Sequence, residues 1–274
     1  MPSKAITPMQ KEYKPELDES DELDKQGITM YQELIGELRW AIEIGRVDIL
    51  HEVSLLSSYQ ASPRVGHLEQ LINIFAFLKR KPKLTLYFDT DIPVIDPNMF
   101  EGSTSEEFRD IYRDAEEQLP DRMPKPRGRG VTTTAFVDAS HAQDKRTRRS
   151  HTGFVIFVNR APVIWYSKRQ NTVETSTFSS EFIALKTCVE SIVSLRTKLR
   201  MFGVPILEET KVLCDNLSAV RNSSKLESTL NKKHSAVAYH AVRWSVAAGI
   251  IKVGWIQTDL NIADPFTNTA GKIG

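Results

Sequence analysis

The segments VTTTAFVD, residues 131–138, and KVLCDN, residues 211–216, bracket the part of the sequence that decides the fold. Each is a short apolar run that leads to an aspartate, Asp138 in the first and Asp215 in the second. Between them lie two further apolar runs and one helical pattern, GFVIFV at 153–158, PVIWY at 162–166 and a stripe at about 179–202. This order predicts three antiparallel strands, a helix, and a fourth strand parallel to the first.

The rest of the C-terminal half continues the alternation of helices and strands. We expect a short helix, a longer helix, a fifth strand and a final turn, at 217–222, 235–248, 251–256 and 264–265. Together these elements predict an α/β fold with a mixed five-stranded sheet and flanking helices.

The N-terminal half has a different pattern. Apolar residues recur at three- and four-residue steps in three segments, 31–44, 47–59 and 65–79, which predicts three helices. LTLYF at 84–88 predicts a short strand, and the Pro- and Gly-rich stretch at 122–130 is typical of a linker. We therefore predict four parts: an extended acidic lead-in at 1–30, a small, mainly helical subdomain at 31–89, a linker at 90–130 and the α/β domain at 131–274.

Composition limits the class of protein only broadly. The 274 residues carry a formal net charge of +1, so a nucleic-acid surface has to come from local clusters of Lys and Arg. The two cysteines, Cys188 and Cys214, lack the paired spacing of a zinc site or a disulfide framework. No apolar run approaches the roughly 20 residues that span a bilayer, and residues 1–24 are too polar for a signal peptide. We expect an intracellular protein with no membrane partner.

Four carboxylates are candidates for a metal site: Asp138, Glu181, Asp215 and Asp264. The two strand-end aspartates lie side by side if the first and fourth strands pair, the first turn of the long helix brings Glu181 to the same edge, and Asp264 starts the final turn. Singly, each has a structural explanation as an Asx turn, a helix-dipole residue or a helix cap. All four in this order predict a site for two magnesium ions roughly 3.5 to 4 Å apart, because such ions need oxygen ligands from several elements.

Several sequence blocks resemble the ribonuclease H domain of copia-type LTR retrotransposon polyproteins: FVDASHAQDKRTRRSHTGFVIF, IWYSKRQNTVETSTFSSEFIAL, CDNLSAV, KKHSAVAYHAVR and NIADPFT. Three earlier blocks resemble the thumb and connection of the same polyprotein's reverse transcriptase: ELDESDELD, YQELIGELRWAIEIGRVDILHEVSLLSSY and GHLEQLINIFAFLK. The resemblance implies a ribonuclease H-like fold and a metal-dependent endonuclease, using Mg²⁺ (or Mn²⁺), that cleaves the RNA strand of RNA:DNA hybrids. It places Asp138, Glu181, Asp215 and Asp264 at the family's four metal-binding positions.

The chain departs from the family's pattern at accessory positions. Ser140 stands where the family usually has a second acid, His141 where it has a tryptophan, and Ser179 where it has an acid before the helix glutamate. The last block reads ADPFTNT rather than a form that ends in Thr-Lys. A histidine near the last helices often assists catalysis in this fold, so His234 and His240 are candidate catalytic residues, although such histidines are more often packing or surface residues.

Basic residues flank the first three predicted strands and are candidates for contact with a nucleic-acid backbone. Together with the polar Asn216, the candidates are Lys145, Arg146, Arg148, Arg149, Lys168 and Arg169. Recognition through sugar and phosphate is expected, because the 2′-hydroxyl distinguishes RNA from DNA without the bases being read. Solvated turns explain the same charges equally well.

Other functions remain open from the sequence. No Asp-Asp dipeptide occurs, so we expect no polymerase activity, and we expect the reverse transcriptase palm and fingers and an integrase to be partners in a parent polyprotein. A catalytically inactive remnant that acts as a nucleic-acid-binding or structural module is the main alternative. A different nuclease or an integrase of similar fold is disfavoured, because the glutamate comes early, on the first helix. A retrotransposon protein is expected in the cytoplasm, within a virus-like particle, or in the nucleus.

Overall fold

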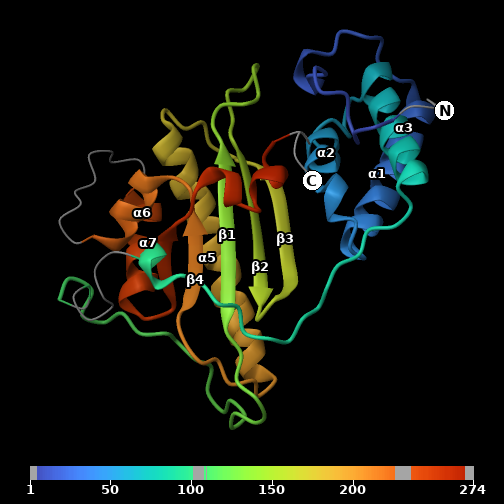
Figure 1. Cartoon of the computed structure of the whole chain (residues 1–274). Helices are drawn as coiled ribbons and strands as arrows, with labels where there is room; N and C mark the ends of the chain where they lie inside the picture. Colours follow the sequence, from blue (N-terminus) through green and yellow to red (C-terminus); the bar gives the residue numbers. More distant parts are fainter. Residues whose placement is uncertain (1–4, 101–107, 109, 226–235, 269–274) are drawn as a thin grey trace.

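A mixed five-stranded sheet forms the centre of the C-terminal half (Figure 1). The computed structural model describes residues 5–100, 108, 110–225 and 236–268. The strands are β1 (Thr133–Ser140), β2 (His151–Val158), β3 (Ala161–Arg169), β4 (Thr210–Cys214) and β5 (Ile251–Trp255), in the spatial order β3-β2-β1-β4-β5. The pairs β1–β2 and β2–β3 are antiparallel, whereas β1–β4 and β4–β5 are parallel. The predicted fold class is therefore confirmed.

Helices cover one face of this sheet and bury alternate residues of its central strands. Ala135 and Val137 of β1 and Phe154 and Ile156 of β2 are fully buried on this face, because side chains alternate between the two faces of a strand. The helices are α5 (Thr177–Met201), α6 (Leu217–Ser224) and α7 (Ala236–Ala247). None of the helices in the described residues has both the length and the apolar character needed to cross a membrane.

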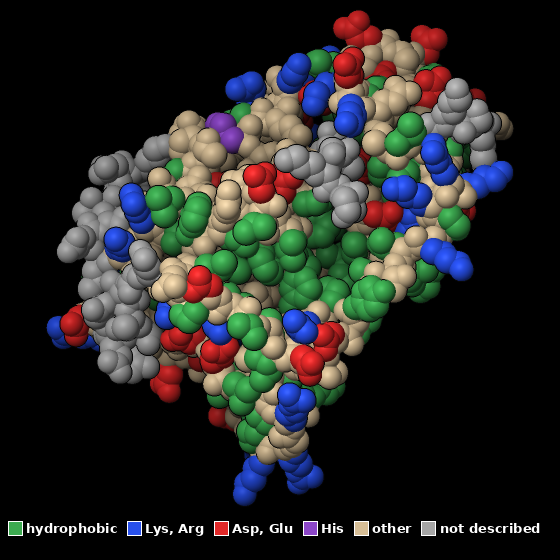
Figure 2. All heavy atoms as spheres, viewed as in Figure 1, with side chains coloured by type: hydrophobic (Ala, Val, Ile, Leu, Met, Phe, Trp, Pro, Cys, Tyr) green, Lys and Arg blue, Asp and Glu red, His purple; other side chains and the backbone are tan. Residues whose placement is uncertain are grey.

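The N-terminal helices lie against the opposite face of the sheet. They are α1 (Lys25–Glu43), α2 (Leu50–Ser57) and α3 (Val65–Arg80). Their buried apolar residues form one cluster with Val155 and Phe266, and Phe157 and Trp165 pack against it. The helices leave part of the face uncovered, and Figure 2 shows a hollow lined by hydrophobic side chains beside them. The helical subdomain and the sheet therefore share a hydrophobic core.

The N-terminal segment differs from the predicted solvated lead-in. Residues 5–24 pack along α3, where His67 Nε2 donates to the Pro15 carbonyl oxygen at 2.9 Å and Asn73 Nδ2 donates to the Pro8 carbonyl oxygen at 2.8 Å. Helix α1 begins at Lys25, six residues before the predicted start, because the Asp24 side chain caps it by accepting from the Gly27 N–H. The prediction of a strand at 84–88 is wrong: these residues lie outside the sheet, and Tyr87 and Phe88 are exposed.

The segment predicted as a linker is anchored at two places. Its 3-10 turn, η3 (Pro97–Phe100), lies so close to β5 that a Cβ atom added to Gly254 would come within 2.7 Å of the Met99 carbonyl oxygen. Further along, the Glu117 carboxylate forms ion pairs with Arg196 and Arg200 of α5. Arg196 is almost fully buried, and a buried guanidinium requires such an anionic partner. The segment therefore belongs to the folded body of the protein.

Candidate metal centre

Two of the predicted acids meet because of strand pairing. Asp138 lies near the carboxyl end of β1, and Asp215 directly follows β4. The two strands run parallel with Val137 opposite Cys214, so Asp138 and Asp215 occupy the next pair of positions in the same register. Neighbouring strands are about 4.8 Å apart, which brings the two carboxylates to one edge of the sheet.

Glu181 reaches the same edge from α5. The helix begins two residues before the predicted start, at Thr177, because the Ser176 hydroxyl accepts from the Ser179 N–H at 3.3 Å. Glu181 is consequently in the second turn rather than the first, and its side chain is buried. A carboxylate oxygen of Glu181, one of Asp215 and Cys214 Sγ all lie within 4.8 Å of one another.

The fourth acid is held in place by the segment that carries it. Asp264 begins the short 3-10 turn η6 (Asp264–Phe266). Before it, Asn261 Nδ2 donates to the Val137 carbonyl oxygen of β1 at 3.0 Å, and after it, the Thr267 hydroxyl donates to Asp138 Oδ2. The charge of Asp264 contributes to raising the pKa of both Asp138 and Asp215. The structure thus brings all four predicted acids together.

Gly153 lets the η6 segment approach the sheet. It lies on β2 directly opposite Asp138. A Cβ atom at this position would come within 2.8 Å of Phe266 Cβ and of Thr267 Cγ2. Such distances force a neighbour to move, so a residue with a side chain would displace the segment that positions Asp264.

We expect Gly153→Ala to lower the free energy of unfolding by about 1 to 3 kcal/mol, because the extra methyl group overpacks the contact with Phe266 and Thr267. The positions of Asp264 and the Thr267 hydroxyl should change as well, since both belong to the displaced segment. Gly36→Ala, in the middle of α1, is the matched control. A Cβ atom added to Gly36 would meet no atom within 4 Å, so alanine there should stabilise the helix by about 0.5 to 1 kcal/mol. Equal effects of the two substitutions in urea melts would contradict the close approach at Gly153.

Burial and mutual repulsion dominate the electrostatics of this site. Burial raises the pKa of Asp138 to about 6, and the charges of Asp215 and Asp264 act in the same direction. The hydrogen bond from Thr267 lowers this pKa but does not outweigh them. Burial, with the charges of Asp138 and Asp215, raises the pKa of Glu181 to about 10. The pKa of Asp215 is also raised, mainly by burial, although Thr258 donates a hydrogen bond to it. An added cation would relieve this repulsion.

The donor set fits a divalent cation that prefers oxygen ligands. Four carboxylates supply hard oxygen atoms from four elements, and Glu181 Oε2 is buried without a hydrogen-bond partner. Cys214 Sγ lies nearby, but burial holds the pKa of its thiol well above its usual range, so it stays protonated. Thiols also suit softer metals. Asp138, Glu181, Asp215 and Asp264 are therefore the residues able to hold Mg²⁺ or Mn²⁺.

Of the two predicted histidines, the structure describes one. His234 lies outside the described residues. His240 is exposed on α7, where its Nδ1 is 2.7 Å from the Tyr112 hydroxyl. It is not among the groups that shift the pKa of Asp138, Glu181 or Asp215. The histidine nearest the site in sequence is His141, just after β1, whose Nδ1 is 3.4 Å from the Ser180 hydroxyl beside Glu181. The sequence signal for His141 was its position three residues after Asp138.

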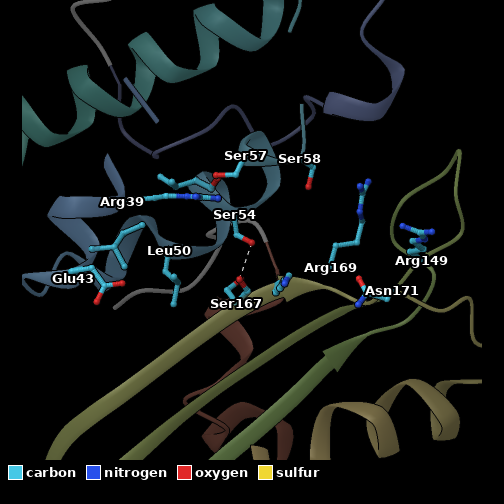
Figure 3. A pocket seen from close by; sticks show the side chains of 13 residues that line it. Arg39, Glu43, Leu50, Ser54, Ser57, Ser58, Arg149, Ser167, Arg169 and Asn171 are labelled. Atoms are coloured by element: carbon cyan, nitrogen blue, oxygen red, sulfur yellow. Dashed lines mark hydrogen bonds between the residues drawn. The ribbon is translucent and has the colours of Figure 1, made fainter. Parts of the chain in front are cut away.

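The predicted nucleic-acid residues divide into three groups. Asn216 caps α6, because its Oδ1 accepts from the Ala219 N–H at 3.0 Å. Three residues are exposed in the turn between β1 and β2: Lys145, Arg146 and Arg148. The last three line a cleft between the end of β3 and the helical subdomain: Arg149, Lys168 and Arg169 (Figure 3).

Comparison with known proteins identifies relatives that match most of the chain. It is 23% identical over 255 residues to a retrovirus-related Pol polyprotein from transposon RE1 of Arabidopsis thaliana, covering 90% of this chain and 15% of that protein. It is 26% identical over 237 residues to a retrovirus-related Pol polyprotein from transposon TNT 1-94 of Nicotiana tabacum, covering 86% of this chain and 15% of that protein. The chain thus spans about 15% of the length of these curated relatives.

No family model matches the sequence. A solved N-terminal RNase H domain of rv2228c from Mycobacterium tuberculosis aligns with 50% of this chain and 91% of its own, with 14% identity and a TM-score of 0.39. The sequence comparisons confirm the resemblance derived from the sequence blocks: the homologues of this chain are copia-type Pol polyproteins of plant transposons, matched over most of its length.

Proposed function

We propose that this chain is a metal-dependent endonuclease that cleaves the RNA strand of RNA:DNA hybrids. The observation that carries the proposal is the convergence of Asp138, Glu181, Asp215 and Asp264 from four elements on one edge of the sheet. Homology to Pol polyproteins supports it. The chain would act beside the reverse transcriptase palm and fingers and the integrase of a parent polyprotein.

The four carboxylates are the proposed metal ligands. When bound there, divalent cations would offset the carboxylate charges, activate a water molecule and stabilise the leaving oxygen. The protein's part is to hold the carboxylates still. The Thr267 hydroxyl donates to Asp138 Oδ2. Interactions with the Ala139 backbone N–H and with the Thr258 side chain favour the charged forms of Glu181 and Asp215. Glu181 Oε2 remains buried without a hydrogen-bond partner and is available as a ligand.

Selectivity for a hybrid follows from the chemistry of the strand that is cut. The 2′-hydroxyl distinguishes RNA from DNA, and contacts to sugar and phosphate require no particular base sequence. The exposed cations in the turn between β1 and β2 are proposed phosphate contacts. They lie in the loop that follows β1, the strand that carries Asp138, and so at the end of that strand where the carboxylates meet.

The test is a cleavage assay with four labelled substrates: an RNA:DNA hybrid, single-stranded RNA, duplex DNA, and a hybrid labelled on its DNA strand. With Mg²⁺ or Mn²⁺ we expect fragments of the RNA strand of the hybrid only, and no fragments in EDTA. Cleavage that persists in EDTA, equal cleavage of single-stranded RNA, or no cleavage of the hybrid by the folded protein would contradict the proposal.

A further inference from the structure

A cleft of about 510 Å³ separates the helical subdomain from the end of β3 (Figure 3). One side is lined by Arg39 of α1, Ser57 of α2 and Ser58, which directly follows α2. Arg149 and Arg169 line the other side. The cleft therefore exists only because the helices and the sheet are packed together.

Positive charge dominates the lining of the cleft. Four cations, Arg39, Arg149, Lys168 and Arg169, face a single lining acid, Glu43. Arg169 is paired with Asp144 at 2.8 Å, whereas the other three cations make no ion pair with any residue that the structure describes. Guanidinium and ammonium groups without an ion-pair partner form a donor-rich surface suited to an anion.

The cleft adjoins the carboxylate site through the strand register. Asp138 of β1 lies opposite Gly153 of β2, and Gly153 lies opposite Ser167 of β3, which lines the cleft. Two strand spacings place Ser167 about 10 Å from Asp138, a distance that a few nucleotides of a strand cover. The Ser167 hydroxyl donates to the Phe266 carbonyl oxygen at 2.6 Å, and the Ser54 hydroxyl donates to the Ser167 carbonyl oxygen at 2.7 Å (Figure 3). One wall is thus common to the cleft and the metal centre.

We propose that this cleft binds the sugar-phosphate backbone of the nucleic acid a few nucleotides from the carboxylates, with Arg39 of the helical subdomain as a phosphate-binding residue. The inference rests on the proposed function, because it takes the same polyanion as ligand. Guanidinium groups match phosphate oxygens in pairs. The helical subdomain would then be part of the substrate-binding surface.

The test measures binding of the full chain to a fluorescent RNA:DNA hybrid in EDTA, where no metal supports cleavage. Arg39→Ala should weaken binding about tenfold and reduce the slope of log K against log salt by about 1. Lys168→Ala should behave similarly. Arg127→Ala is the control, because it removes the same charge from an exposed residue beside Gly203, just after the C-terminal end of α5. The affinity of this variant for the hybrid should match that of wild type. Arg39 and Lys168 are exposed, so equal melting temperatures are expected for all variants.

The outcomes separate the cleft from the proposed function. Binding in EDTA reports on the cleft even if no cleavage is seen with metal. Where cleavage is seen, Arg39→Ala should raise KM and leave kcat unchanged. Unchanged affinity in Arg39→Ala and Lys168→Ala, or an equal loss in Arg127→Ala, would overturn the inference. Displacement of the hybrid by polyglutamate of the same charge at equal concentration would also overturn it, since it would indicate a site for acidic peptide.

Discussion

Asp215→Asn should reduce the proposed cleavage of the RNA strand of a hybrid by about 1000-fold or more, because asparagine keeps the shape of the side chain but removes a charge that the proposed metal ions would need. The backbone at this position is well held: Trp255 Nε1 donates to the Asp215 carbonyl oxygen at 3.1 Å. The substitution should therefore leave the fold intact. Single-turnover rates at saturating Mg²⁺ measure the effect.

Asp121→Asn is the matched control for this experiment. It makes the same chemical change at an exposed acid of the segment between η3 and β1. Its cleavage rate should equal that of wild type. If Asp215→Asn retained metal-dependent cleavage near the wild-type rate, Asp215 would not be a metal ligand and the assignment of the site would be wrong.

Asp138→Asn should raise the free energy of unfolding in EDTA by about 0.5 to 2 kcal/mol at neutral pH. In the metal-free protein, burial and the charges of Asp215 and Asp264 oppose ionisation of Asp138. Asparagine removes the charge, and its side-chain oxygen can still accept the hydrogen bond from Thr267. This is the usual exchange of stability for activity at a functional site.

The effect of Asp138→Asn should depend on pH in a defined direction. The folded-state pKa of about 6 lies above the unfolded value of about 3.9. Protonated Asp138 therefore favours the folded state fully below pH 4, and this contribution is lost as the pH rises through 6. The advantage of the variant should be absent below pH 4 and complete above pH 6. A constant difference between pH 4 and pH 8 would contradict the raised pKa.

Magnesium should reverse the order of stability of these two proteins. A ligand that binds only the folded state stabilises it, and wild type should bind the metal more tightly than Asp138→Asn. The gap in melting temperature should therefore narrow or change sign as Mg²⁺ is added. If Asp138 merely ended a turn, asparagine would be neutral or destabilising and metal would have no effect.

Local sequence patterns were sufficient to predict the sheet and the acid cluster. The aspartates end two apolar strands, and the helix between them makes those strands parallel, so the topology alone brings Asp138 and Asp215 together. The position of Asp264 depends on more than its own turn. It requires the close packing of Phe266 and Thr267 against Gly153 and the hydrogen bond from Asn261 to Val137 of β1. Both contacts join residues more than 100 positions apart in the sequence.

The contacts that the sequence did not reveal join distant segments. The run GFVIFV at 153–158 is apolar at every position after its glycine, which indicates burial on both faces of β2. The pattern does not reveal that α1 to α3 pack on the face opposite α5. The ion pair of Glu117 with Arg196 likewise has no local signature. LTLYF at 84–88 has strand propensity without a neighbouring strand, and propensity alone does not form a sheet.

The most direct test of the central claim, that the four carboxylates form a divalent metal centre, is a Mn²⁺ titration of the folded protein followed by electron paramagnetic resonance. Wild type and Asp121→Asn should bind up to two ions with the same affinity, and Asp215→Asn should bind at least about tenfold more weakly. Identical Mn²⁺ binding by all three proteins would show that the carboxylate cluster is not the metal site.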